Sequence, residues 1–217
     1  MRIFTILVGV LFSASVFAAE HAPSMIFPYL EGKDYVVLET PVATANPAKI
    51  EVAEVFSYTC PHCFHFESLL DEWMKSQQPD VALVQVHASW NSAMEAYQRG
   101  YYTTQALKIK DKTHVAIFNA FHVQHKELPD AQAWADFLSA YGVSKQTVLS
   151  TYNSDAVTKQ LKQADQLFRS YQITGTPELV VEGKYRISTR FSGSQEDMLK
   201  VIQYLVNKVR AERAAKK

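Results

Sequence analysis

The sequence predicts an α/β chain in which a mixed central sheet flanked by helices is interrupted by an all-helical domain. Strand-like segments rich in Val, Ile and Phe occur at residues 50–57 and 81–87 and return after residue 177. Between about residues 92 and 171, apolar residues instead recur at helical spacing. With 217 residues, 47% of them hydrophobic, the chain can bury a substantial core.

The first 18 residues have the pattern of a secretory signal peptide. A basic start at Arg2 is followed by an apolar run from Ile3 to Phe17 and by small residues at a cleavage position after Ala18. The run is shorter than the roughly 20 apolar residues that span a bilayer. We therefore expect cleavage and export rather than a retained membrane anchor.

The mature chain begins with a strand-helix-strand unit at residues 19–91. A short strand at residues 35–38 precedes a second strand at 50–57. The Cys60-Pro61-His62-Cys63 segment then opens a helix, and a third strand follows at 81–87. This order predicts a parallel pair of strands joined by a helix that starts at the cysteines.

Residues 92–171 are predicted to form the helical insertion. Aromatic and aliphatic residues form stripes that we interpret as core packing and not as a cofactor site; they include Val115, Phe118, Trp134, Leu138, Val157 and Leu161. Residues 172–217 complete the sheet with strands at 178–182 and 185–188. A capping box formed by Ser194 and Asp197 begins the last helix.

Charge and cysteine content narrow the possible functions. The 22 Lys and Arg residues balance the 22 Asp and Glu residues and are scattered, so no nucleic-acid-binding face is expected. The two cysteines lie three positions apart, whereas exported proteins that use disulfides for stability carry several widely spaced pairs. Cys60 and Cys63 are therefore predicted to form a redox-active disulfide.

The position of Cys60 at a helix start suits this chemistry. Disulfide exchange requires a thiolate, and the free N–H groups and positive dipole end of a helix stabilise one. Pro61 has no N–H to leave unpaired there, and His62 adds a donor or a positive charge. Stabilising the thiolate favours the reduced dithiol and makes the site an oxidant. Cys63 falls on the apolar helix face and is expected to be the buried partner.

Zinc binding and a purely structural disulfide are weaker alternatives. Cys60, His62, Cys63 and His65 are clustered, but no later cysteine completes a closed zinc site. A bridge that closes so short a loop constrains little of the unfolded chain. We therefore expect neither a metal nor a cofactor.

Two further positions lie near the predicted site. Glu54 is on the core face of its strand six residues before Cys60; it is either a proton-transfer group for Cys63 or a strand glutamate with a hydrogen-bond partner. Gly175-Thr176-Pro177 precedes a strand, where a cis proline would shape a loop that pairs with an extended substrate peptide.

With these residues in hand, the chain resembles the DsbA family. The similarity includes Glu54 to Tyr58 leading into Cys-Pro-His-Cys, the helical insertion, Gly175-Thr176-Pro177 and Gly183-Lys184-Tyr185. It implies a thioredoxin fold split by a helical domain, a monomer in the periplasm, and oxidation of newly exported proteins with free thiols. It also implies reoxidation by a DsbB-like quinone-linked protein of the inner membrane.

The resemblance further assigns roles to residues. It implies Cys60 as nucleophile, Cys63 as resolving thiol and His62 as thiolate stabiliser. It implies Pro177 as a cis proline beside Thr176, and Glu54 and Glu67 as nearby acids. Two departures stand out: Gln85 occupies a position where family members often have lysine, and Thr176 one where they often have valine.

Two other functions remain open at this stage. Thr176 is the one sign of a disulfide isomerase or reductase, although the chain before Tyr35 is too short for the dimerisation domain of DsbC-type isomerases. A non-enzymatic peptide-binding or metal-binding protein that retains the fold is the alternative from another class. Insulin reduction and dithiol oxidation by the wild type and Cys60→Ser separate these possibilities.

Overall fold

The computed structural model describes residues 29–216, and the predicted signal peptide at residues 1–18 lies outside the described residues. The strands are β1 (Val36–Val37), β2 (Ile50–Phe56), β3 (Val81–His87), β4 (Glu178–Val181) and β5 (Tyr185–Ser188). The helices are α1 (Pro61–Lys75), α2 (Ser92–Ala106), α3 (Lys110–His122), α4 (Ala131–Ser139), α5 (Lys145–Tyr152), α6 (Asp155–Ser170), α7 (Thr189–Ser192) and α8 (Gln195–Ala214).

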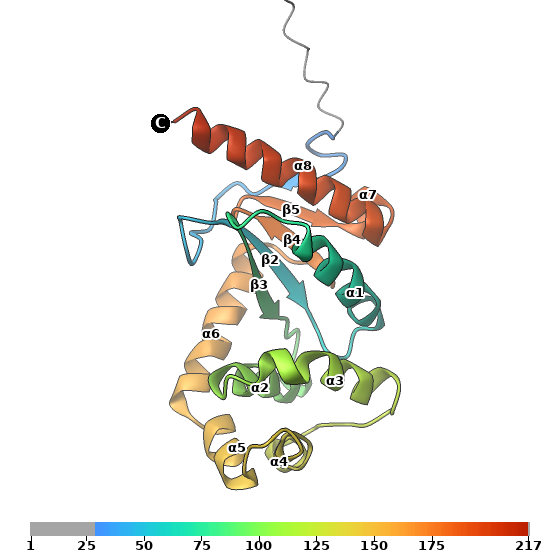
Figure 1. Ribbon diagram of the computed structural model, residues 1–217, viewed down its shortest axis with the longest axis vertical. Helices are drawn as coiled ribbons and strands as arrows, with labels where there is room; N and C mark the ends of the chain where they lie inside the picture. Colours follow the sequence, from blue (N-terminus) through green and yellow to red (C-terminus); the bar gives the residue numbers. More distant parts are fainter. Residues whose placement is uncertain (1–28, 217) are drawn as a thin grey trace, which may run out of the picture.

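The strands form one mixed sheet in the order β1-β5-β4-β2-β3. The β2 and β3 strands are parallel, whereas β4 runs antiparallel to both β2 and β5. The predicted fold class is confirmed: this is a thioredoxin fold, with β2-α1-β3 before the inserted helices and β4-β5-α8 after them (Figure 1). Helices α2 to α6 fall within residues 92–171, and the division of the chain at these two boundaries stays a prediction.

Two clusters of buried residues hold the layers together. On one face of the sheet, α1 and α8 pack against Val52 and Leu179. The second cluster contains Val55 and Phe56 of β2 together with Trp134 of α4 and Leu161 of α6. This second cluster joins the sheet to the helical insertion.

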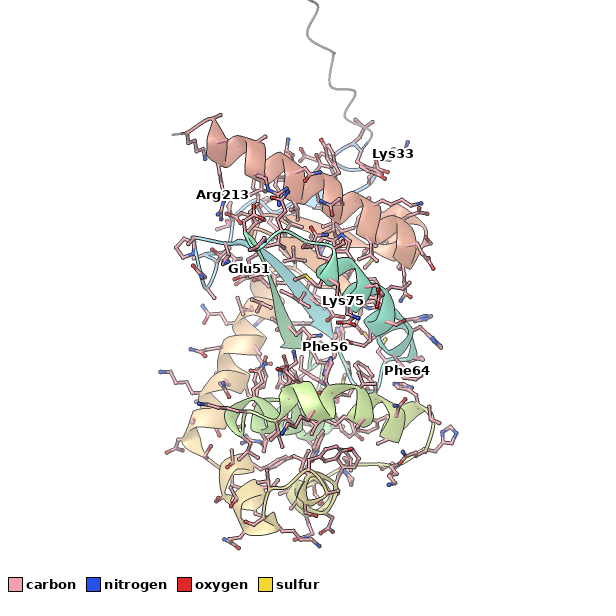
Figure 2. All side chains as sticks on the ribbon, in the orientation of Figure 1. Lys33, Glu51, Phe56, Phe64, Lys75 and Arg213 are labelled. Carbon is pink, nitrogen blue, oxygen red and sulfur yellow. The ribbon has the colours of Figure 1, made fainter. Side chains whose placement is uncertain are left out.

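The end of β2 nearest the insertion is rich in aromatic contacts. Figure 2 shows Phe56 of β2 and Phe64 of α1 at this end of the sheet. The ring of Phe56 lies 5.9 Å from that of Phe118 on α3, and the ring of Phe64 stacks on His122 at 5.0 Å. The helix that carries the cysteines is therefore packed directly against α3.

One predicted core position in α3 is wrong. Val115 is 60% exposed, whereas His114, Ile117 and Phe118 are buried. The buried face of α3 runs through His114, Ile117 and Phe118, and Val115 falls outside it because successive helical residues point about 100° apart. Val115 instead lines the edge of a cavity between α1 and α3.

No helix among residues 29–216 is both long enough and apolar enough to cross a membrane. The last helix, α8, begins as predicted: the Ser194 hydroxyl accepts a hydrogen bond from the backbone N–H of Asp197 at 3.0 Å.

Candidate active site

Cys60 is the residue at which the first long helix begins. Its backbone is extended, with φ −88° and ψ 116°, and Pro61 occupies the first turn of α1. The helix starts immediately after the β2 strand and its short connection, so the sulfur lies where the first N–H groups of the helix have no partner within it. Cys63, one turn later, faces the core and is fully buried, while Cys60 is partly exposed.

The two thiols have opposite pKa shifts. Hydrogen bonding from the Cys63 thiol is the largest influence that lowers the pKa of Cys60, to about 5; the Thr176 side chain and the backbone N–H groups of Cys63 and His62 add to it against the effect of burial. Burial, together with the neighbouring Cys60 sulfur, raises the pKa of Cys63 far above its ordinary value. At neutral pH, Cys60 is therefore a thiolate and Cys63 a thiol.

The loop before β4 faces this pair across the site. The Thr176–Pro177 peptide bond is cis, as expected. The Cys60 sulfur lies 3.3 Å from the backbone carbonyl oxygen of Thr176, which can accept a hydrogen bond from the thiol. The Thr176 side chain also stabilises the thiolate. The geometry therefore brings together Cys60, Cys63, Thr176 and Pro177.

His62 reaches the sulfur of Cys60 through its backbone. The side chain of His62 is exposed, and the contribution of this residue to the lowered pKa of Cys60 comes from its backbone N–H. Its carbonyl oxygen accepts a hydrogen bond of 2.7 Å from the side chain of Gln195 on α8. The role of the imidazole as thiolate stabiliser stays a prediction.

Glu54 is fully buried beneath the site. Its Oε2 accepts a hydrogen bond of 2.7 Å from Gln85, and its Oε1 has no partner among residues 29–216. Burial and the carboxylate of Glu67 raise the pKa of Glu54, against smaller opposing effects of Gln85 and His114. Its charge in turn raises the pKa of Cys63. Glu54 therefore holds a proton more firmly than an ordinary carboxyl and acts electrostatically on Cys63.

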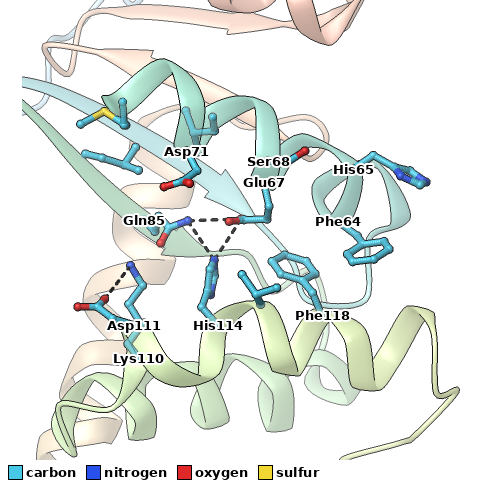
Figure 3. A pocket seen from close by; sticks show the side chains of 14 residues that line it. Phe64, His65, Glu67, Ser68, Asp71, Gln85, Lys110, Asp111, His114 and Phe118 are labelled. Atoms are coloured by element: carbon cyan, nitrogen blue, oxygen red, sulfur yellow. Dashed lines mark hydrogen bonds and ion pairs between the residues drawn. The ribbon is translucent and has the colours of Figure 1, made fainter. Parts of the chain in front are cut away.

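A second layer of polar side chains joins Glu54 to the inserted domain. Figure 3 shows Gln85, Glu67 and His114 converging, each from a different element. Nε2 of His114 lies 3.1 Å from Glu67 and 3.2 Å from Gln85. Burial lowers the pKa of His114 to about 4, so its ring is neutral at neutral pH and its contact with Glu67 is a hydrogen bond rather than an ion pair.

The segment just before Cys60 is also bound to α3. The Tyr58 hydroxyl lies 2.8 Å from Nδ1 of His114, and the Tyr58 carbonyl lies 2.8 Å from Nε2 of His122. A cavity of about 710 Å³ opens between α1 and α3, lined in part by Glu67, Gln85 and His114. These side chains thus connect the buried acid to the surface between the two domains.

His114 and Tyr58 are the residues beside the site whose contacts the sequence analysis missed. His114 is a single histidine in a helix, and no local motif relates it to the cysteines. Glu54 and Gln85 are opposite one another in the parallel β2–β3 pair. Aligning the two predicted strands side by side would have placed these two residues next to each other. No group of three or more His, Cys, Asp or Glu side chains within residues 29–216 is arranged to hold a metal ion.

A Cys-X-X-Cys pair at a helix start, faced by a cis-proline loop on this fold, defines a thiol–disulfide oxidoreductase. Residues 51–203 match the family model of the DSBA-like thioredoxin domain. The chain is 41% identical to the thiol:disulfide interchange protein DsbA of Pseudomonas aeruginosa, over 87% of this chain and 89% of that protein. It is 36% identical to the Pseudomonas syringae protein of the same name, over 95% and 94%.

Solved structures agree with the sequence relatives. The crystal structure of Pseudomonas aeruginosa DsbA matches with a TM-score of 0.82 and 40% identity, covering 88% of this chain and 99% of that one. DsbA from Xylella fastidiosa matches with a TM-score of 0.80 and 32% identity, covering 84% and 98%. The chain belongs to the DsbA-like family of the thioredoxin superfamily and is a protein disulfide oxidoreductase.

Proposed function

We propose that this protein introduces disulfide bonds into newly exported proteins through the Cys60–Cys63 pair. The observation that carries the proposal is the asymmetry of the two thiols: Cys60 is partly exposed with a pKa of about 5, whereas Cys63 is completely buried with a raised pKa. A site that stabilises the thiolate of its reduced form gives up its disulfide readily, so it acts as an oxidant.

The exchange proceeds in two steps. A substrate thiolate attacks the Cys60 sulfur, the Cys60–Cys63 bond breaks, and the Cys63 sulfur leaves and takes up a proton. A second substrate thiolate then attacks the substrate sulfur of the mixed disulfide, and Cys60 leaves as a stabilised thiolate. Two electrons pass from the two substrate thiols to the cysteine pair.

We assign the proton of the first step to Glu54. Its raised pKa keeps it protonated at neutral pH, and the buried Cys63 sulfur is strongly basic when it leaves. The reverse reaction returns the proton to Glu54. Thr176 and Pro177 form the surface against which the substrate peptide lies, and the His62 imidazole adds to thiolate stabilisation.

The cellular setting belongs to the same proposal. The secretory pattern of residues 1–18 supports export to the periplasm, where disulfides persist. Electrons then pass from the reduced Cys60–Cys63 pair to a DsbB-like quinone-linked protein of the inner membrane, and the protein works as a monomer. No nucleic acid, metal or other cofactor takes part.

The test is the equilibrium with glutathione together with oxidation of a reduced two-cysteine peptide. We expect the Cys60–Cys63 disulfide to be reduced by micromolar to low millimolar glutathione, and Cys60→Ser to abolish peptide oxidation. If the pair stays oxidised in a large excess of glutathione, the proposed role of the protein as an oxidant is wrong. Isomerase or reductase activity is the second candidate, favoured by the Thr176 side chain at the sulfur, and insulin reduction measures it.

A further inference from the structure

Glu178 is a buried carboxylate that the exchange chemistry does not use. It is the first residue of β4 and directly follows Pro177, and it is only 2% exposed. A carboxylate is costly to bury unless hydrogen bonds and a nearby positive charge compensate it. The contacts of Glu178 therefore indicate what it does in the fold.

One carboxylate oxygen holds the start of the loop that faces Cys60. Oε1 of Glu178 accepts a hydrogen bond of 2.7 Å from the Thr174 hydroxyl and one of 3.2 Å from the Thr174 backbone N–H. Burial raises the pKa of Glu178, and the hydrogen bonds from Thr174, the charge of Arg186 and the backbone N–H of Gly175 act against that rise. The residue that directly follows the loop 174–177 is thus hydrogen-bonded to the residue at which the loop begins.

The other oxygen faces β5. Oε2 of Glu178 lies 3.7 Å from Nε of Arg186, and neither atom has a hydrogen-bond partner among residues 29–216. The guanidinium therefore supplies charge rather than a direct hydrogen bond. Since Arg186 is on a strand that is paired on both sides, it provides a fixed support for the carboxylate.

We propose that Glu178 is a positioning residue that presets the loop 174–177 for pairing with a substrate peptide by accepting the hydrogen bonds of Thr174. The proposal rests on the proposed function, because it deepens the role given there to Thr176 and Pro177. Two loop residues separate Thr174 from Pro177, and one of them, Thr176, presents its carbonyl to the Cys60 sulfur. Fixing Thr174 therefore fixes the backbone that a substrate meets.

Three variants separate the hydrogen bonds from the charge. Glu178→Ala removes both, whereas Glu178→Gln keeps an oxygen that can accept from Thr174. The amide of that variant replaces Oε2, which makes no hydrogen bond among the described residues. Thr174→Val removes the hydroxyl donor and keeps the pair with Arg186. The control is Ser144→Ala, which removes the N-cap of α5 in the helical insertion and destabilises the protein away from the loop.

The experiment measures two quantities on the full chain. The first is hydrogen exchange at the amides of Thr174, Gly175 and Thr176, which requires no activity. The second is KM for a reduced two-cysteine peptide, compared with the rate for dithiothreitol, which has no peptide backbone to pair. We expect Glu178→Ala to accelerate hydrogen exchange in the loop and to raise the peptide KM roughly tenfold. Thr174→Val should also accelerate hydrogen exchange and should raise the peptide KM about threefold. Glu178→Gln and Ser144→Ala stay within about twofold of the wild type.

Some outcomes overturn the inference. The inference is wrong if folded Thr174→Val shows the hydrogen exchange and the peptide KM of the wild type, even if Glu178→Ala fails to fold. Equal losses in Glu178→Gln and Glu178→Ala would assign the effect to charge and not to the loop hydrogen bonds. A wild type that does not oxidise the peptide refutes the proposed function instead, while the exchange rates still decide whether Glu178 orders the loop.

Discussion

The sulfur of Cys60 lies 3.3 Å from the carbonyl oxygen of Thr176, a residue 116 positions later in the chain. One comes from the start of α1 and the other from the loop before β4. Because the Thr176 side chain also contributes to the lowered pKa of Cys60, this residue influences both the protonated and the ionised sulfur.

Replacing Thr176 by valine tests this contact. Thr176→Val removes a hydroxyl that stabilises the thiolate, so the pKa of Cys60 rises and the site becomes a weaker oxidant. A hydrogen bond of this kind contributes about 1 kcal/mol, which corresponds to some tens of millivolts for this two-electron couple. The glutathione equilibrium and the lifetime of a trapped substrate complex are the measurements. If neither differs from the wild type, the hydroxyl does not act on the sulfur.

Selective alkylation tests the asymmetry of the thiols. In the reduced protein, iodoacetamide should modify Cys60 and spare the buried Cys63. The rate should follow the thiolate of a group with a pKa of about 5, well below the range of free cysteine. Mass spectrometry of digests identifies the modified residue, and rates measured from pH 4 to 9 give the pKa. Predominant modification of Cys63 contradicts the assignment.

The reduced protein should unfold at higher denaturant concentration than the oxidised one at neutral pH. The pKa of Cys60 is lower in the folded state than in the unfolded chain, so the thiolate contributes stability that is complete above the unfolded pKa, near 8.5. This contribution declines as the pH falls and is lost as it passes through about 5. At neutral pH it is on the order of 2 kcal/mol after allowance for solvent screening of a partly exposed sulfur. If the oxidised form is the more stable at neutral pH, the proposed role of the protein as an oxidant is wrong.

Replacing Glu54 should separate stability from catalysis. Burial raises the pKa of Glu54 in the folded state, so the native protein keeps a proton that the unfolded chain releases. The carboxyl therefore destabilises the fold increasingly as the pH rises above about 4.3, the ordinary pKa of glutamate. Glu54→Gln should therefore unfold later than the wild type at pH 8, by about 1–3 kcal/mol, with a smaller difference at pH 5.

The same Glu54→Gln variant should exchange disulfides more slowly if Glu54 carries the proton of Cys63. Stopped-flow oxidation of a reduced peptide measures this rate. Glu51→Gln is the matched control, because Glu51 is a second buried acid on β2 whose pKa is raised by burial. An unchanged rate in Glu54→Gln leaves the residue as an electrostatic neighbour of Cys63 and removes its proton-transfer role.

Sequence patterns predicted what depends on neighbours along the chain. The exposure of Cys60 against the burial of Cys63 follows from helical spacing, and the Ser194 cap from a local motif. His114 could not be found this way, because its contacts with Glu67 and Gln85 arise only when α3 packs against α1 and β3. The sequence places Glu178 only at the start of a strand, because its hydrogen bonds to Thr174 depend on the path of the loop between them.

The aromatic cluster between β2 and the helical insertion has a consequence for protein engineering. Phe56 and Tyr58 belong to the same buried cluster as Trp134 and Leu138, so the insertion supplies part of the interior of the catalytic half. Excising residues 92–171 would leave these rings in water, and the remaining chain would aggregate rather than give a minimal thioredoxin. A chimaera with the insertion of a relative has to carry matching residues at positions 56, 58 and 64. In such chimaeras the helical insertion and the residues around the catalytic motif therefore have to be exchanged together.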